Sequence, residues 1–242
     1  MKSVRNIVFS PHIDDAVLSL GGLIARLATS SGDLCVINIF TLSNWINPDG
    51  IFKDRFAETD TEVISNVRKA EEAESGRLLH YSTDFLDFPD LPLRDGLVSY
   101  HELYNRIKDK IKEYLGKDIR AFFPLGIDHP DHEIIAAIGY ELLDEGYPVL
   151  FYEDMPYVAR NYGSGNLVKA KAIQRGFISF PVEIDIMRKM EAIKVYESQV
   201  SEEWLIDIYN YSQKDDSPLF QEYIWSTFPN IYDQNFYIVM EG

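Results

Sequence analysis

The feature that most constrains the fold is an alternation of strand and helix patterns in the first forty residues. A short apolar run covers residues 6–10, and apolar side chains then recur at helical spacing over residues 15–30. A second apolar run, rich in β-branched residues, covers residues 34–41. Because a strand, a helix and a strand in this order form a right-handed parallel unit, the chain begins as an α/β sheet.

Later segments continue this alternation. Further strands are predicted at residues 85–88, 121–125, 149–152 and 236–240. Further helices are predicted at residues 61–79, 101–115 and 184–199, whereas residues 158–177 give no clear signal. Gly21 and Gly22 interrupt the first helix pattern, which predicts close packing of that helix on the sheet. Together these elements predict an α/β fold with a doubly wound, mainly parallel sheet and helices on both faces.

The length of the chain predicts one domain. A single α/β domain commonly reaches 242 residues, and no linker divides this sequence. The 46% of hydrophobic residues suffices for a full core. We therefore expect one domain over residues 1–242, with a C-terminal extension from about residue 200. The many aromatic residues of that extension, Trp204 among them, are expected mainly in the core, and an oligomer interface or a sugar-stacking platform are the alternatives.

Charge and cysteine content limit the environment and the partners. A net charge of −16 disfavours nucleic acid and anionic membranes, so neutral or cationic substrates are expected, with a homo-oligomer left open. Cys35, the single cysteine, excludes an intrachain disulfide and is expected to be a buried thiol. The sequence shows neither a signal-peptide pattern nor eighteen consecutive apolar residues, so a cytoplasmic location is the expectation.

The segment Pro11-His12-Ile13-Asp14-Asp15 lies at the junction of the first strand and helix. His12 and Asp15 are three residues apart, so a helix beginning within the motif places both on one face, where they can share a cation. Asp14 points about 100° away and can act as a base beside such a metal. The alternative is that Asp14 and Asp15 are ordinary helix N-terminal acids, with His12 a chance neighbour.

A second cluster favours the metal interpretation. The segment Asp128-His129-Pro130-Asp131-His132 also follows a strand pattern and precedes a helix pattern. In a doubly wound sheet these two junctions meet at the topological switch point. Two histidines and one carboxylate with open positions are the ligands of a catalytic zinc, and they also suit Fe²⁺. Spacing alone does not decide which of His129 and His132 binds the metal.

Two further features allow two interpretations each, and a third has one at this point. The stretch Ser43 to Asp60 follows the end of a strand, which suggests a substrate loop, but it also suits an ordinary connection. Arg68 is either a surface charge or a contact reaching the site. Asp90 is a turn residue by composition.

The two motifs, with Gly21-Gly22, resemble those of the LmbE-like, or PIG-L, zinc-dependent N-acetylglucosaminyl de-N-acetylases. Weaker similarities lie at Arg68-Lys69-Ala70-Glu71, Asp90, Tyr152-Glu153-Asp154 and Tyr196-Glu197-Ser198-Gln199, so the resemblance extends over about residues 5 to 200. It implies the Rossmann-like LmbE fold. Ile13 and Ala16 stand where the family often has proline and an acid, and neither is an expected ligand.

The resemblance also implies roles for individual residues. It assigns His12, Asp15 and His132 to the metal, which is Zn²⁺ or another divalent ion such as Fe²⁺. Asp14 is then the general base, His129 the oxyanion donor in its protonated form, and Asp131 the partner that orients a motif histidine. Arg68 and Asp90 are the implied substrate-binding residues.

The activity implied is hydrolysis of an N-acetyl group from an amino sugar or sugar conjugate. Two alternatives remain at this point. One is a non-catalytic sugar-binding or regulatory protein on the same fold, which the free carboxylate of Asp14 disfavours. The other is a metal hydrolase of a different amide or ester, because related catalytic groups serve different substrates when the surrounding loops differ.

Overall fold

The computed structural model describes residues 5–31, 33–50, 60–94, 96, 99–213 and 218–227, and the statements below concern these residues. The strands among them form one sheet, in the order β3-β2-β1-β4-β5-β7-β6. The strands are β1 (Arg5–Ser10), β2 (Leu34–Leu42), β3 (Ser82–Pro89), β4 (Ile119–Pro124), β5 (Val149–Tyr152), β6 (Phe177–Ile184) and β7 (Phe220–Thr227).

The five strands β1 to β5 are parallel, as the sequence predicts. Ile7 of β1 pairs with Cys35 of β2 on one side and with Ala121 of β4 on the other. All three side chains are buried. Since β1 and β4 are neighbours that run in the same direction, their carboxyl ends meet at one edge of the sheet. The two motifs lie at those two ends.

The strands β6 and β7 form an antiparallel part that the sequence analysis missed. In β7, Trp225 pairs with Phe151 of β5 and with Ser179 of β6. The helix predicted over residues 184–199 is wrong at both ends, because Ile184 belongs to β6 and helix α8 covers only Ile186–Ile193. The side chain of Asp185 caps α8 by accepting from the Arg188 N–H (3.1 Å). The strand predicted at residues 236–240 lies outside the described residues.

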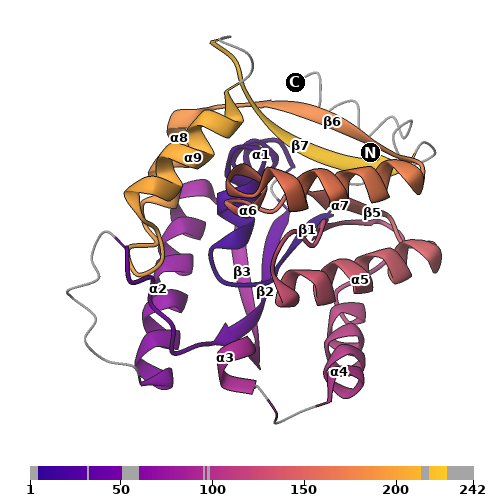
Figure 1. Ribbon diagram of the computed structural model, residues 1–242, viewed down its shortest axis with the longest axis horizontal. Coiled ribbons are helices and arrows are strands. Elements are labelled where there is room, and N and C mark those ends of the chain that lie inside the picture. Colours follow the sequence, from indigo (N-terminus) through magenta and orange to yellow (C-terminus); the bar gives the residue numbers. More distant parts are fainter. Residues whose placement is uncertain are drawn as a thin grey trace.

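Helices cover both faces of the sheet (Figure 1). On one face α1, α2 and α8 contact one another, and on the other α4 packs against α5. None of the described helices has the length and apolar character of a membrane span. The helices are α1 (Asp15–Ser31), α2 (Thr61–Leu79), α3 (Leu91–Arg94), α4 (Tyr100–Lys112), α5 (Pro130–Asp144), α6 (Tyr157–Arg160), α7 (Tyr162–Gln174), α8 and α9 (Glu202–Ser212). Helices α6 and α7 occupy the stretch that gave no clear signal.

Helix α1 is broken at Leu20, whose φ of −124° and ψ of 18° are not helical. The break exposes backbone groups that lack partners within the helix. Glu222 of β7 accepts from the N–H groups of Gly22 (2.9 Å) and Leu23 (2.8 Å). The Lys189 ammonium of α8 lies 2.9 Å from the same carboxylate, and Lys189 is fully buried. The antiparallel part of the sheet therefore inserts a buried ion pair into the break.

The break also places α1 in contact with other parts of the chain. The Lys189 ammonium donates to the Ser19 carbonyl oxygen (3.3 Å), which lies on the other side of the break. The Ser19 hydroxyl in turn accepts from the Met155 N–H (3.1 Å), just before α6. A Cβ added at Gly22 would lie 2.4 Å from the Ile184 Cβ of β6, so this glycine permits the close packing of helix and sheet that the sequence predicts.

Candidate functional site

The site begins in the turn that follows β1. The Ser10 hydroxyl donates to the His12 carbonyl oxygen and accepts from the Ala16 N–H (2.9 Å), which fixes the turn between strand and helix. The carboxylate of Asp15, the first residue of α1, accepts from the His12 N–H (2.7 Å). This local bonding turns the His12 and Asp15 side chains toward the neighbouring end of β4.

Three donor atoms form a small triangle at that edge of the sheet. Asp15 Oδ2 lies 3.1 Å from His12 Nδ1 and 3.0 Å from His132 Nε2, and the two nitrogens are 3.3 Å apart. Tetrahedral ligands 2.0–2.1 Å from a zinc ion are separated by about 3.3 Å. The donor set that the resemblance assigns to the metal therefore has a spacing that suits a tetrahedral ion.

His129 lies beside this triangle. One nitrogen from each of His12, His129 and His132 falls within 4.8 Å of the others, so a set of three histidines is a second candidate for metal binding.

His129 also caps α5, because its Nδ1 accepts from the Asp131 N–H (3.2 Å). A nitrogen that accepts carries no proton, so the proton of the neutral ring is on Nε2. Burial, together with the neighbouring His12 and His132, lowers the pKa of His129 to about 4, so the ring is neutral at neutral pH and not in the protonated form that the resemblance implies.

Asp131 is the outer partner of His12. Its Oδ2 lies 3.0 Å from His12 Nε2 and accepts from the Leu91 N–H (3.2 Å), while Arg94 pairs with its other oxygen. Burial alone would raise the pKa of Asp131, but His12 and Arg94 hold it well below its usual range. A carboxylate on the far nitrogen of a metal-binding histidine fixes the ring and increases its basicity.

Asp154 is the corresponding partner of His132. It follows β5, and its Oδ1 lies 2.6 Å from His132 Nδ1. Its Oδ2 accepts from the N–H groups of Gly126 (3.0 Å) and Ile127 (3.3 Å), so the carboxylate is itself held in place. Although burial opposes it, the carboxylates of Asp15 and Asp154 raise the pKa of His132 to about 10.

The charges in this cluster favour a cation. The carboxylates and guanidinium groups in contact there are those of Asp14, Asp15, Asp131, Asp154, Arg68 and Arg94. When the imidazoles are neutral, as metal binding requires, this linked set carries two net negative charges in a largely buried region. Without an ion, the proton that His132 holds with its pKa of about 10 balances one of them. Such a cluster is costly without a balancing charge, and a divalent cation supplies it.

Asp14 lies next to the triangle without belonging to it. Its Oδ1 is 3.4 Å from a terminal nitrogen of Arg68, and it is 5% exposed. Burial raises the pKa of Asp14, the Asp15 charge raises it further, and Arg68 and His12 oppose the shift. A carboxylate with a raised pKa beside a metal site suits a group that takes up a proton and returns it.

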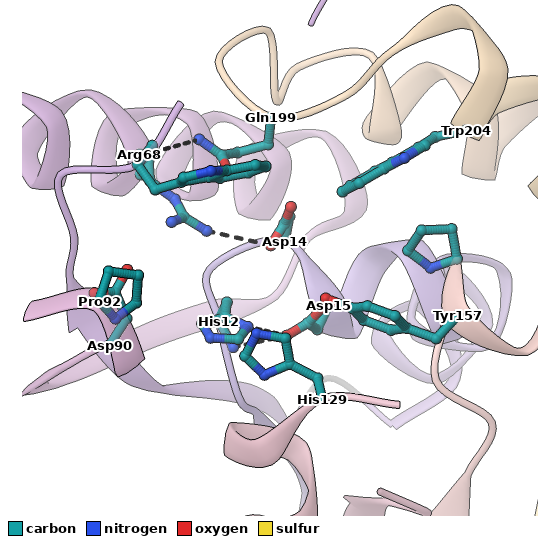
Figure 2. Close-up of a pocket in the computed structure, with 12 residues that line it drawn as sticks. His12, Asp14, Asp15, Arg68, Asp90, Pro92, His129, Tyr157, Gln199 and Trp204 are labelled. Atoms are coloured by element: carbon teal, nitrogen blue, oxygen red, sulfur yellow. Dashed lines mark hydrogen bonds and ion pairs between the residues drawn. The ribbon is translucent and has the colours of Figure 1, made fainter. Parts of the chain in front are cut away.

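A cavity of about 280 Å³ opens above these groups (Figure 2). The two predicted substrate-binding residues, Arg68 and Asp90, both line it. Asp90 is 4% exposed, and its Oδ1 is buried with no hydrogen-bond partner among the described residues. The other lining residues are His12, Asp14, Asp15, Trp45, Pro92, His129, Pro156, Tyr157, Gln199 and Trp204.

The predicted substrate loop contributes to this cavity through Trp45. Residues 51–59 of that loop lie outside the described residues, so the prediction applies only to the part from Ser43 to Gly50. There the Asn47 side chain donates to the Gln199 carbonyl oxygen (2.7 Å), which ties the loop to the segment that follows α8. Both segments therefore reach the rim of the cavity.

Several residues of the site had no role in the sequence analysis. In the sequence, Asp154 was recognised only as part of a weak similarity. It follows β5, the strand next to β4, and the carboxyl end of such a strand is where α/β sheets bind ligands, so its position could have indicated a site residue. Arg94 lies in a four-residue helix that the sequence did not predict. Tyr157, Gln199 and Trp204 follow β5, in the part of the chain whose strands β6 and β7 the sequence analysis missed.

Comparisons with known proteins agree with this geometry. A 2'-N-acetylparomamine deacetylase from Streptomyces fradiae is 26% identical over 229 residues, which cover 87% of this chain and 78% of that protein. The A40926 pseudoaglycone deacetylase Dbv21 has a similar fold, with a TM-score of 0.70, 19% identity and coverage of 93% of this chain and 97% of its own. The N,N'-diacetylchitobiose deacetylase from Pyrococcus horikoshii gives a TM-score of 0.62 at 17% identity, covering 96% and 86%.

The family model of GlcNAc-PI de-N-acetylase, called PIG-L, matches residues 7–143. This range is more than half of the 242 residues. It contains both motifs, Arg68 and Asp90, and it ends within α5, before β5. The chain therefore belongs to the PIG-L family of N-deacetylases.

Proposed function

We propose that the protein hydrolyses the N-acetyl group of an amino sugar within a sugar conjugate, and that it does so with a divalent metal. The observation that carries this proposal is Asp14, a buried carboxylate with a raised pKa beside a triangle of three metal-type donors, on the wall of a cavity. The names of the relatives support the substrate class, since they act on N-acetylated paromamine and N,N'-diacetylchitobiose.

In this proposal His12, Asp15 and His132 hold the metal, and Zn²⁺ is the first candidate. The spacing of the donors fits a tetrahedral ion, and two imidazoles with one carboxylate also suit Fe²⁺. When bound, zinc lowers the pKa of a water to about 7 and polarises an amide carbonyl. Asp131 and Asp154 orient the two histidines from the side away from the metal.

The chain's own groups then move the protons. Asp14 takes a proton from the attacking water as the new C–O bond forms, and gives it to the amine nitrogen as the C–N bond breaks. The second proton of the water also ends on the amine, so the products are acetate and a protonated amine, and atoms and charges balance. His129 donates from Nε2 to the developing oxyanion, and it does so as a neutral ring, because its Nδ1 is engaged as an acceptor.

Arg68 and Asp90 bind the sugar in this proposal. Asp90 offers a buried oxygen with no partner among the described residues, which a sugar hydroxyl satisfies. Arg68 is fixed by the Ser43 hydroxyl (3.1 Å) and by Asp14, so its guanidinium is already in place when substrate arrives. The cytoplasmic location, the oligomeric state and the single-domain boundary stay predictions.

Release of acetate is the direct test. The purified protein, loaded with zinc, is incubated with N-acetylglucosamine and with N,N'-diacetylchitobiose, and acetate and free amine are measured in parallel. We expect both products in equal amounts, with the Asp14→Asn variant as the negative control. A protein that binds these sugars but releases no acetate is a sugar-binding protein. Release of acetate only from esters or unrelated amides assigns it to another class of hydrolase.

A further inference from the structure

The rim of the cavity carries two tryptophans that the chemistry above does not use. Trp45 is 41% exposed and Trp204 is half-buried, and both line the cavity. The chain has three tryptophans, and the third, Trp225, is 4% exposed and bonded to Glu153 in the core. Two large indole surfaces at the mouth of one cavity form an apolar surface available to a ligand.

The segment that carries Trp45 is held in place from both sides. The Trp45 N–H donates to the Ser43 hydroxyl (3.1 Å). The Trp45 carbonyl oxygen accepts from Gln199 Nε2 (3.2 Å). Next to it, the Asn47 N–H donates to the Ser198 carbonyl oxygen (3.1 Å). A surface that is fixed before binding loses little freedom when a ligand arrives, so it can contribute to affinity.

Gln199 supplies a polar contact beside the indoles. Its Nε2 donates to the Trp45 carbonyl oxygen and to the Ser198 hydroxyl (3.0 Å), so both of its protons are used. The carboxamide oxygen is the part of this side chain that can accept from a ligand. Gln199 is 1% exposed and lines the cavity, and in Figure 2 Gln199 and Trp204 lie across the cavity from His129.

We propose that Trp45, Trp204 and Gln199 form a subsite for a second sugar ring, so that the preferred substrate is a glycoside of the N-acetylated amino sugar. This proposal rests on the proposed function for the position of the first ring. A pyranose ring offers C–H groups to the indoles and hydroxyl donors to the carboxamide oxygen. An alkyl chain would cover the indoles but offer no hydrogen-bond donor to the carboxamide oxygen of Gln199.

The kinetic test compares one sugar ring with two. We expect kcat/KM for N,N'-diacetylchitobiose to exceed that for N-acetylglucosamine by about 10-fold or more in the parent protein. Trp204→Ala and Trp45→Ala should each lower the ratio of the two values by about 5-fold or more, mainly through KM. Trp204→Phe should restore part of that ratio, because a ring remains for stacking.

The ratio separates a subsite from a folding defect, because a misfolded variant loses activity on both sugars together. The matched control is Tyr100→Ala, which removes an aromatic ring that is 62% exposed and does not line the cavity. It should leave the ratio at the parental value. A parental ratio near one, or an unchanged ratio in both tryptophan variants, would overturn the proposal.

A binding measurement keeps this proposal independent of turnover. N,N'-diacetylchitobiose is titrated into the Asp14→Asn variant while tryptophan fluorescence is followed. We expect a saturable change at lower concentration than for N-acetylglucosamine, and most of it should disappear when Trp204→Phe is added. A saturable change without acetate release from the parent protein refutes the proposed reaction but retains the subsite. No change for either sugar refutes the subsite.

Discussion

The parallel half of the sheet and its antiparallel half contribute to the site in different ways. The turns and helices that follow β1, β4 and β5 supply the metal-type donors, the base and their carboxylate partners. The segments around β6 and β7 supply the rim residues Gln199 and Trp204 and the ion pair that fills the break in α1. Substitutions in the first half should therefore change chemistry, and substitutions in the second should change stability or substrate choice.

The largest effect is expected in the parallel half at His132. His132→Ala should remove the bound metal and reduce turnover to background, since one donor of the triangle is lost. Elemental analysis of the purified variant measures this directly. His129→Ala is the matched control, and we expect it to retain about one metal per chain. Metal lost from His129→Ala but kept in His132→Ala would instead favour His129 as the ligand.

The next effect separates metal binding from proton transfer. Asp14→Asn keeps the shape of the side chain but cannot take up the proton, so turnover should fall roughly 10²-fold or more with the metal retained. Acetate release and metal content, measured on the same preparation, test this. The midpoint of thermal unfolding is recorded as well, because the substitution leaves the buried Arg68 guanidinium without its charged partner. Turnover close to the parental rate would exclude Asp14 from the mechanism.

In the antiparallel half the expected loss is in stability. Lys189→Met leaves the buried Glu222 carboxylate without its ammonium, and breaking such a pair typically costs about 3–5 kcal/mol of the free energy of unfolding. Urea unfolding gives this value. Lys110→Met is the control, because its partner Glu113 is a surface residue and exposed pairs contribute about 0–1 kcal/mol.

The double variant Lys189→Met with Glu222→Gln sharpens this test. The neutral amide still accepts from one N–H of the break, so part of the lost stability should return. Equal losses in Lys189→Met and in the control Lys110→Met would mean that the buried pair does not stabilise the fold. Metal content should be unchanged in all these variants, in contrast to His132→Ala.

The smallest effect is expected at Glu72 of α2. This residue contacts β2 and β3 of the parallel half and also Tyr196, which follows α8. Burial raises the pKa of Glu72 to about 7, although Tyr196, Asn38 and Thr83 donate hydrogen bonds that oppose the shift. The folded-state pKa thus lies above the ordinary value of 4.5, so the folded protein holds a proton that the unfolded chain releases. Stability should therefore fall as the pH rises from about 4.5 through 7, by roughly 3 kcal/mol at most from this group.

Unfolding in urea at a series of pH values measures this contribution. Glu72→Gln should remove the part of the decline that Glu72 causes. Glu71 remains, and burial also raises its pKa to about 7 while it accepts from the Ser198 N–H and hydroxyl. An identical pH profile in parent and variant would show that Glu72 titrates near its ordinary pKa.

The same two halves explain which parts of the fold were predictable. The strands β1, β2, β4 and β5 are short, almost entirely buried runs next to clear helix patterns, so local sequence identifies them. The strands β6 and β7 pair with each other across a long sequence separation, and β6 alternates irregularly between buried and exposed positions around Pro181. Such pairing leaves little trace in local sequence, since the partner decides the structure.

The residues of the site also differ in how well the sequence predicts them. The eight residues assigned from the motifs all lie at or beside the cavity, because each follows a strand of the parallel half or faces that end of the sheet. The metal, base and substrate roles assigned to them stay predictions. Gln199 was named only within a weak similarity, and Trp204 only as one of several aromatic residues with a sugar-stacking platform as an alternative. Neither was assigned to the site, because nothing in a turn after α8 or in the first turn of α9 signals a cavity. Their position depends on how α8 and α9 pack, which is a property of the whole fold.

The break in α1 has a consequence for the order in which the protein can mature on the ribosome. Glu222 is 200 residues beyond Gly22, so the carboxylate that completes this helix is among the later parts to be synthesised. Until it leaves the exit tunnel, the helix that begins with Asp15 has unpaired N–H groups in its middle. The nascent chain can therefore form its parallel strands early, but the helix next to the turn that carries His12 becomes fully bonded only when β7 adds to the sheet.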